Sequence, residues 1–139
     1  MVTPWLFSQH LKEKQIKMNI ESYREYCLSL PLTGEKTPFD QVTLVFTVVD
    51  KMFALANMDK FESINLKCDP EKAIQFREEY PAIIPGWHMN KKHWNTVILD
   101  GSLNDDFIYE LTKHSYDCVV NSLPKKVKMK SKILQTDNE

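Results

Sequence analysis

Residues 81–99 read PAIIPGWHMNKKHWNTVIL. Two prolines and Gly86 bend the first half of this segment, and the run from Trp94 to Leu99 predicts a strand. Between the two tryptophans lie His88, Lys91, Lys92 and His93. The segment holds no carboxylate, serine or cysteine that could act as nucleophile or base. We therefore expect this loop to contact a partner rather than to make or break bonds.

Three helices are predicted around the loop. Asn19 can cap the first, whose apolar positions recur at helical spacing until Pro31. Asp69-Pro70-Glu71 is a strong start for the second, which ends near Tyr80. Ser102 with Asp105 forms a near capping box for the third, which Pro124 ends.

The strands are predicted from β-branched and alternating runs. Thr43 to Val49 and Met52 to Ala56 form a hairpin around Asp50-Lys51, and residues 64–67 form a third strand. Residues 33–38 have loop composition. Short turns between strands predict an antiparallel sheet, and one-sided apolar stripes predict helices packed on it. The expected fold class is therefore α+β, with two layers.

The length and composition of the chain limit the classes of function that we expect. A chain of 139 residues fits one domain, and its three cysteines have no disulfide or zinc-site spacing. The apolar runs are far shorter than a membrane helix, no signal-peptide order appears, and three glycines provide no phosphate-binding loop. We expect a cytoplasmic protein without membrane contact or cofactor, and a monomer.

Charge is unevenly distributed along the chain. Residues 19–123 carry 10 basic and 16 acidic side chains, a net charge of −6, whereas residues 124–139 carry a net charge of +3. We divide the chain into an N-terminal extension at residues 1–17 that includes a possible short helix, a domain at residues 18–124, and a basic flexible tail at residues 125–139. The local positive cluster of the domain lies between the two tryptophans.

Five stretches carry a family resemblance. They are Asn19-Ile-Glu-Ser-Tyr-Arg-Glu-Tyr-Cys-Leu-Ser-Leu-Pro31, Asp50-Lys-Met-Phe-Ala-Leu55, Ile64-Asn-Leu-Lys-Cys-Asp-Pro-Glu71, Pro85-Gly-Trp-His-Met-Asn-Lys-Lys-His-Trp-Asn-Thr-Val97 and His114-Ser-Tyr-Asp117. With them, the run from Met18 to about Lys126 resembles the MmcQ/YjbR family of small bacterial proteins. Residues 1–17 and the tail after Lys126 lie outside the match.

The resemblance implies the order helix, three strands, helix, two strands, helix, a fold similar to that of type III secretion chaperones. It also implies the label that this family usually carries, a DNA-binding protein with a double-wing motif.

DNA binding through the loop is the first functional hypothesis. Lys91 and Lys92 would meet phosphates, and Lys67 and the tail lysines would add nonspecific attraction. Four further residues would offer hydrogen bonds: His88, Asn90, His93 and Asn95. In the simpler structural interpretation, the tryptophans anchor the core or its rim and the lysines only solvate a turn. The acidic domain also weighs against DNA, because DNA-binding surfaces are usually broadly basic.

A protein-interaction module is the second hypothesis. Trp87, Met89 and Trp94, or the face of the sheet, would bind a peptide or another protein. Salt separates the two hypotheses, because phosphate contacts weaken steeply with salt whereas an aromatic interface changes little.

Metal binding and catalysis are less favoured. His88 and His93 would need a third ligand such as His114 or Asp117, and no cysteine pair or zinc-protease motif accompanies them. Cys68 has no cation beside it except Lys67. The consecutive residues 114–117 contain triad residue types but point in different directions on a helix. We therefore expect neither a metal site nor enzymatic activity.

Overall fold

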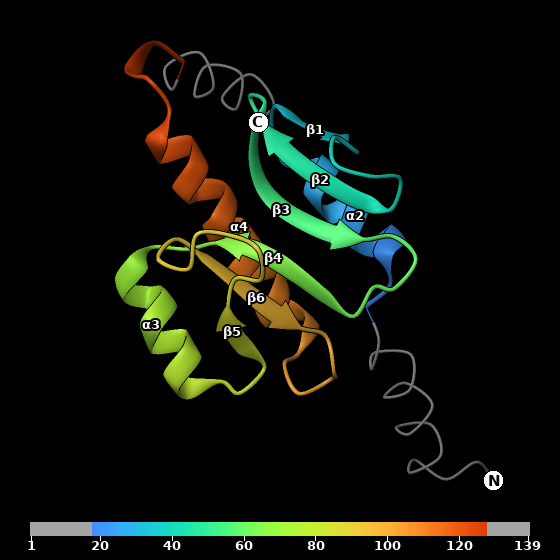
Figure 1. The fold of residues 1–139 in the computed structure, drawn as a ribbon. Helices are drawn as coiled ribbons and strands as arrows, with labels where there is room; N and C mark the ends of the chain where they lie inside the picture. The colour runs from blue at the N-terminus through green and yellow to red at the C-terminus, as the bar shows by residue number, and fades with distance from the viewer. Residues whose placement is uncertain (1–17, 128–139) are drawn as a thin grey trace, which may run out of the picture.

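The computed structural model describes residues 18–127. The predictions for residues 1–17 and for the tail beyond residue 127 lie outside these residues. The elements are, in chain order, α2 (Ile20–Ser29), β1 (Thr33–Lys36), β2 (Thr43–Val48), β3 (Lys51–Asn57), β4 (Ser63–Lys67), α3 (Pro70–Glu79), β5 (Ile83–Pro85), β6 (Trp94–Ile98) and α4 (Asp105–Ser122). Figure 1 shows how they are arranged.

The strands form a single six-stranded sheet in the order β1-β2-β3-β4-β6-β5, and every neighbouring pair is antiparallel. In Figure 1, α2 lies near the β1 end of the sheet and α3 beside the β4-β6-β5 half. The predicted α+β class, an antiparallel sheet packed by helices, is confirmed. β6 lies between β4 and β5, so the loop that joins β5 to β6 starts and ends on neighbouring strands.

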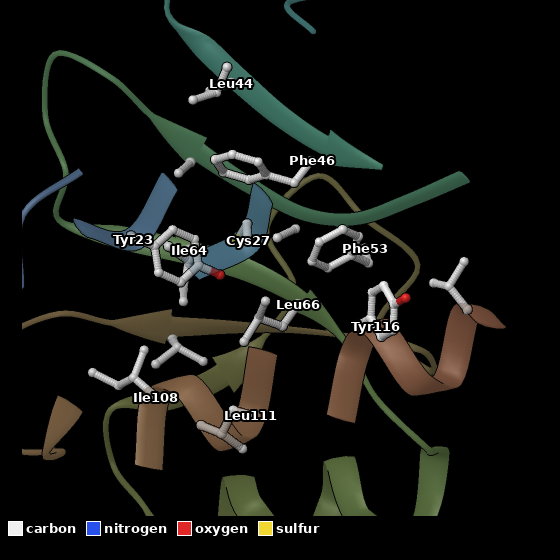
Figure 2. Packing of buried hydrophobic residues seen from close by; sticks show 14 of the residues in the cluster. Tyr23, Cys27, Leu44, Phe46, Phe53, Ile64, Leu66, Ile108, Leu111 and Tyr116 are labelled. Atoms are coloured by element: carbon white, nitrogen blue, oxygen red, sulfur yellow. The ribbon is translucent and has the colours of Figure 1, made fainter. Parts of the chain in front are cut away.

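The main core lies between the sheet and helices α2 and α4. Tyr23 of α2 and Tyr116 of α4 are buried there against Phe46 and Phe53 of the sheet, as Figure 2 shows. The Tyr23 hydroxyl lies 2.9 Å from Thr112 Oγ1, so its polar end is satisfied within the core. This packing fixes which face of every strand is covered by helices.

A second, smaller cluster lies on the opposite face of the sheet. Val45, Leu55 and Trp94 are buried in it, and Met52 and Met89 pack against them from the side. Successive strand residues point to opposite faces, and accordingly Phe46 belongs to the main core while Val45 belongs to the second cluster. The β5–β6 loop, which contributes Met89, therefore covers this second face.

Helix starts agree with the predictions in two of three cases. Asn19 Oδ1 accepts a hydrogen bond from Ser22 N at 2.7 Å, and Asp69 Oδ2 accepts one from Lys72 N at 3.2 Å. The predicted Ser102 start of α4 is wrong. Asn104 is the N-cap, with Oδ1 accepting from Phe107 N at 2.8 Å.

The loop predicted at residues 33–38 is also wrong in part, because Thr33–Lys36 forms the edge strand β1. Its register pairs Thr33 with Val48 and Lys36 with Val45. The strand therefore depends on pairing with β2 rather than on its own composition. None of the helices within residues 18–127 is long and apolar enough to cross a membrane.

Candidate nucleic-acid interface

The β5–β6 loop, residues 86–93, has a buried stem and an exposed tip. We call Gly86, Trp94 and Asn95 the stem, and Trp87, His88, Asn90, Lys91 and Lys92 the tip. Each stem residue is buried, whereas each tip residue is exposed. The ten residues that the sequence nominated for binding are thus divided between different environments.

Gly86 starts the loop at a point where no side chain fits. Its N–H donates to the Trp94 carbonyl at 2.9 Å. A Cβ atom at residue 86 would lie 2.9 Å from both the Cβ and the carbonyl oxygen of Trp94. Contacts this short are essentially never seen for a Cβ, so the close approach of the two loop ends requires glycine.

The first residues of the tip are fixed to the sheet by the backbone. Trp87 N donates to Thr96 Oγ1 at 2.9 Å, and that hydroxyl donates to Asn65 Oδ1 of β4. The next residue, His88, has a φ of 57°, in the left-handed region that side-chain-bearing residues adopt uncommonly. This conformation turns the chain where the exposed part of the loop begins.

Asn90 forms the turn that carries the two lysines. Its side-chain oxygen accepts from Lys92 N at 2.9 Å, and its carbonyl accepts from Trp94 N at 2.9 Å and from His93 N at 3.2 Å. A short asparagine side chain that binds backbone two residues ahead is a common turn-forming device. Asn90 therefore presents Lys91 and Lys92 from a hydrogen-bonded turn.

Arg77 of α3 ties the loop to the neighbouring helix, and sequence reasoning missed it. Its Nε donates to Asn95 Oδ1 at 2.6 Å, and its guanidinium also donates to the carbonyls of Lys91 and Trp94. No local signal in the sequence identifies Arg77, because its partners lie 14 to 18 residues further along the chain. One turn earlier on α3, the carbonyl of Ala73 also accepts from Asn95 Nδ2. Arg77 thus holds the loop and is not a free cation.

The tip presents an aromatic side chain beside two free cations. Trp87 is 56% exposed, the largest exposed fraction of any tryptophan in residues 18–127. Lys91 and Lys92 are exposed and form no salt bridge within the described part of the chain. Both lysines can therefore meet an anionic partner without breaking an existing ion pair.

Two nominated residues are corrected by their burial. Asn95, nominated for DNA, is 3% exposed, and its amide is engaged by Arg77 and Ala73. Trp94, nominated for a partner, is 8% exposed within the second cluster. Met89 is half-buried against the same cluster, so only part of its side chain can face a partner.

Lys67 and His93 lie away from the tip. They line a groove of about 580 Å³ between the β4–α3 junction and the second half of α4. The backbone connects this groove to the loop, because Cys68 N donates to the His93 carbonyl at 2.7 Å. The nominated set therefore spans two places, the tip and the groove.

The groove also contains the remaining metal and thiol candidates. His114 Nε2 accepts from Asp69 N at 3.3 Å and lies 3.4 Å from Cys118 Sγ. No group of three or more potential ligands is placed to hold a metal ion within residues 18–127. Burial raises the pKa of Cys68 to about 12 and also raises the pKa of Cys118. Both thiols are therefore protonated at neutral pH and poor nucleophiles.

Known proteins match this sequence and fold over most of the domain. A YjbR family model matches residues 28–118. The chain belongs to the YjbR family. The uncharacterized protein YjbR of Escherichia coli (strain K12) is 36% identical over 108 residues, 77% of this chain and 92% of that protein. The uncharacterized protein YyaQ of Bacillus subtilis (strain 168) is 31% identical over 111 residues, 78% of this chain and 90% of that protein.

Two solved structures that are also similar in sequence share the fold. The crystal structure of Deinococcus radiodurans protein DR2400, described as a DUF419 domain, has a TM-score of 0.74 and 38% identity, covering 81% of this chain and 86% of the other. A crystal structure from Pseudomonas syringae has a TM-score of 0.59 and 33% identity, covering 70% of this chain and 96% of the other. The family relation therefore rests on both sequence and structure.

Proposed function

We propose that this YjbR family protein is a non-enzymatic DNA-binding protein that contacts backbone phosphates through Lys91 and Lys92. One observation carries the proposal: two adjacent, exposed lysines without salt-bridge partners in residues 18–127 project from a turn that Asn90 and Arg77 hold in place. A loop fixed in this way loses little conformational freedom on binding, which favours affinity.

The other nominated residues take different roles in this proposal. His88 and Asn90 lie on the exposed tip and can offer hydrogen bonds beside the lysines. Lys67 and His93 add positive charge or hydrogen bonds from the groove side. Asn95 takes no direct part, because its amide is buried and engaged.

Binding, rather than catalysis, agrees with the chemistry of the domain. Burial raises the pKa of Cys27 to about 12 and of Cys68 to about 12, which removes both thiols as ready nucleophiles. The Ser115 hydroxyl is buried and donates to the Phe53 carbonyl, while it accepts from Lys67 N at 2.8 Å. Ser115 thus has a structural role, and neither of the two thiols is activated as a nucleophile.

The expected affinity is weak and sensitive to salt. Nonspecific DNA binding has dissociation constants on the order of 10⁻⁴ to 10⁻⁶ M at physiological salt. Two phosphate contacts are few, and the domain around them carries a net charge of −6 over residues 19–123. Repulsion between this acidic domain and DNA confines productive contact to the local positive tip.

Fluorescence anisotropy of labelled duplex DNA tests the proposal with the full chain. We expect Lys91→Glu/Lys92→Glu to weaken binding by roughly tenfold or more and to lower the salt slope by about two. The matched control is Lys36→Glu/Lys60→Glu, which changes the net charge equally. Lys36 lies on the opposite edge strand and Lys60 in the turn after β3, and both are exposed. Equal losses in the two variants, or unchanged binding in the first, would refute the proposal.

A protein or peptide partner remains the second candidate because of Trp87. An exposed tryptophan next to a half-buried methionine suits the centre of an interface. In that case Trp87→Ala would abolish partner binding at every salt concentration. Under the DNA proposal, the same variant reduces duplex binding far less than the double glutamate variant does.

A further inference from the structure

The groove that Lys67 and His93 line has the size of a ligand pocket and is separate from the tip. Its volume of about 580 Å³ falls within the range of small-molecule sites. Its walls come from the β4–α3 junction, the end of the β5–β6 loop and the second half of α4. Three segments that are distant in the sequence thus converge on one concavity.

The charge balance of the groove is positive. Lys67 and Lys72 line it, and neither forms a salt bridge within residues 18–127. Asp69 is the only carboxylate among the lining residues, and its side chain caps α3 by accepting from Lys72 N at 3.2 Å. The groove therefore carries two ammonium groups and one carboxylate, a net positive charge in a domain that is acidic overall.

The charges of Lys67 and Lys72 affect the pKa values of side chains that line the groove. Burial lowers the pKa of His114, and the charge of Lys72 lowers it further. Burial raises the pKa of Cys118, and the charge of Lys67 opposes that increase. Each lysine thus acts on a different side chain of α4, Lys72 on His114 and Lys67 on Cys118, and the carboxylates of Asp69 and Asp117 oppose the lysine at both.

The uncharged lining supplies both hydrogen bonds and apolar contact. His114 Nε2 accepts from Asp69 N, so the neutral ring carries its proton on Nδ1. Asn121 and Ser122 of α4 are exposed at the rim. The protonated thiol of Cys68 and the ring of Pro70 add apolar surface.

We propose that this groove binds a small phosphomonoester, with the phosphate between Lys67 and Lys72 and the organic part against the thiol side of the groove. A doubly charged phosphate matches two ammonium groups, and charge-assisted hydrogen bonds are the strong ones. The groove is open to solvent and has room for a small molecule, whereas Lys91 and Lys92 lie exposed on the tip. The site goes beyond the proposed DNA contact because it uses neither Lys91 nor Lys92, although Lys67 also adds positive charge to the DNA surface.

Amide NMR shifts of the full chain, titrated with phenyl phosphate, test this proposal. We expect saturable shifts at residues 67–72 and 114–122, and none with phenol at the same concentrations, because phenol lacks the charge. Lys67→Gln/Lys72→Gln should weaken binding roughly tenfold or more. The matched control Lys36→Gln/Lys60→Gln should bind as the unchanged protein does.

The remaining outcomes separate this proposal from the proposed function. Lys91→Glu/Lys92→Glu should lose DNA and keep phenyl phosphate. Absence of saturable shifts, equal shifts with phenol, or full binding by Lys67→Gln/Lys72→Gln would overturn the groove site. If that glutamine variant instead loses only DNA binding, the groove belongs to the DNA surface and the small-molecule proposal fails.

Discussion

Trp87 lies in the β5–β6 loop and Trp94 directly follows that loop, yet the first is 56% exposed and the second 8%. The two asparagines differ in the same way, because Asn90 shapes the exposed turn whereas Asn95 is buried beneath Arg77. Residues of the same type thus have different structural roles in the tip and in the stem. Composition alone identifies such a loop as a candidate interface, but the three-dimensional structure decides which half can touch a partner.

The stem and the tip differ in exposure because they lie differently relative to the sheet. Trp94 and Asn95 start β6, whose faces are both covered, because Trp94 packs in the second cluster and Val97 in the main core on the other side. The tip leaves the sheet after Gly86 and is held by hydrogen bonds rather than by burial. Substitutions in the stem should therefore change stability, and substitutions in the tip should change binding.

We expect the largest difference in unfolding free energy between the alanine variants of Trp94 and Trp87. Trp94→Ala removes a buried aromatic side chain from the second cluster and should lower the free energy of unfolding by about 3–5 kcal/mol. Trp87→Ala, at the tip, should change it by only about 0.5 kcal/mol. Urea denaturation of both variants measures the two values. Similar losses of unfolding free energy in the two variants would contradict the distinction between a buried stem and an exposed tip.

Gly86 tests the close approach of the loop ends. Gly86→Ala places a Cβ 2.9 Å from the Trp94 backbone oxygen, so the two chain segments must separate. We expect a loss of about 1–3 kcal/mol, similar to overpacking a core. The control is Gly34→Ala, where the new Cβ would lie in ordinary van der Waals contact with Thr47 Oγ1, at 3.7 Å. Equal stability of the two alanine variants would show that the stem can relax.

Arg77 connects the stem with the tip. Arg77→Met keeps much of the side-chain length but removes the hydrogen bonds to Asn95, Lys91 and Trp94. We expect a loss of about 1–2 kcal/mol, since the half-buried site lets water replace part of the lost bonds. DNA binding should weaken as well, because the lysine turn becomes mobile. Amide hydrogen exchange at residues 90–92 measures that mobility, and unchanged exchange would contradict the role of Arg77.

The features of the fold that were predicted correctly depend on residues that are close together in the sequence. The caps at Asn19 and Asp69 act within one helical turn, so their residue types suffice to place the starts of α2 and α3. Thr33–Lys36 has loop composition and becomes a strand only through pairing with β2. Non-local hydrogen bonds of this kind leave no trace in the segment itself.

Prediction of the candidate site from the sequence was limited in the same way. The sequence located the loop, its lysines and its tryptophans, but it did not separate stem from tip. Both faces of β6 are covered, so its residues show no alternation of polar and apolar types that would mark Asn95 as buried. Arg77 was missed because its partners lie 14 to 18 residues further along the chain. Contacts between elements, rather than residue types, decide these roles.

The smallest expected effect concerns His114, which lines the groove together with His93, compared with His88 at the tip. Burial lowers the pKa of His114 below its ordinary 6.5, and Nε2 accepts from Asp69 N. Well above pH 6.5 the ring is neutral in both folded and unfolded chains, so this contribution to stability is complete. As the pH falls below 6.5, the unfolded chain binds the proton first, and stability decreases until the folded ring is protonated too.

His114→Gln isolates this dependence, because glutamine does not titrate. We expect the free energy of unfolding of the unchanged protein to fall more steeply than that of the variant between about pH 7 and pH 5. Urea denaturation across this range measures both curves, and His88→Gln is the control at the tip. Parallel curves for the unchanged protein and His114→Gln would mean that the His114 ring is no more protected from protons in the groove than in the unfolded chain.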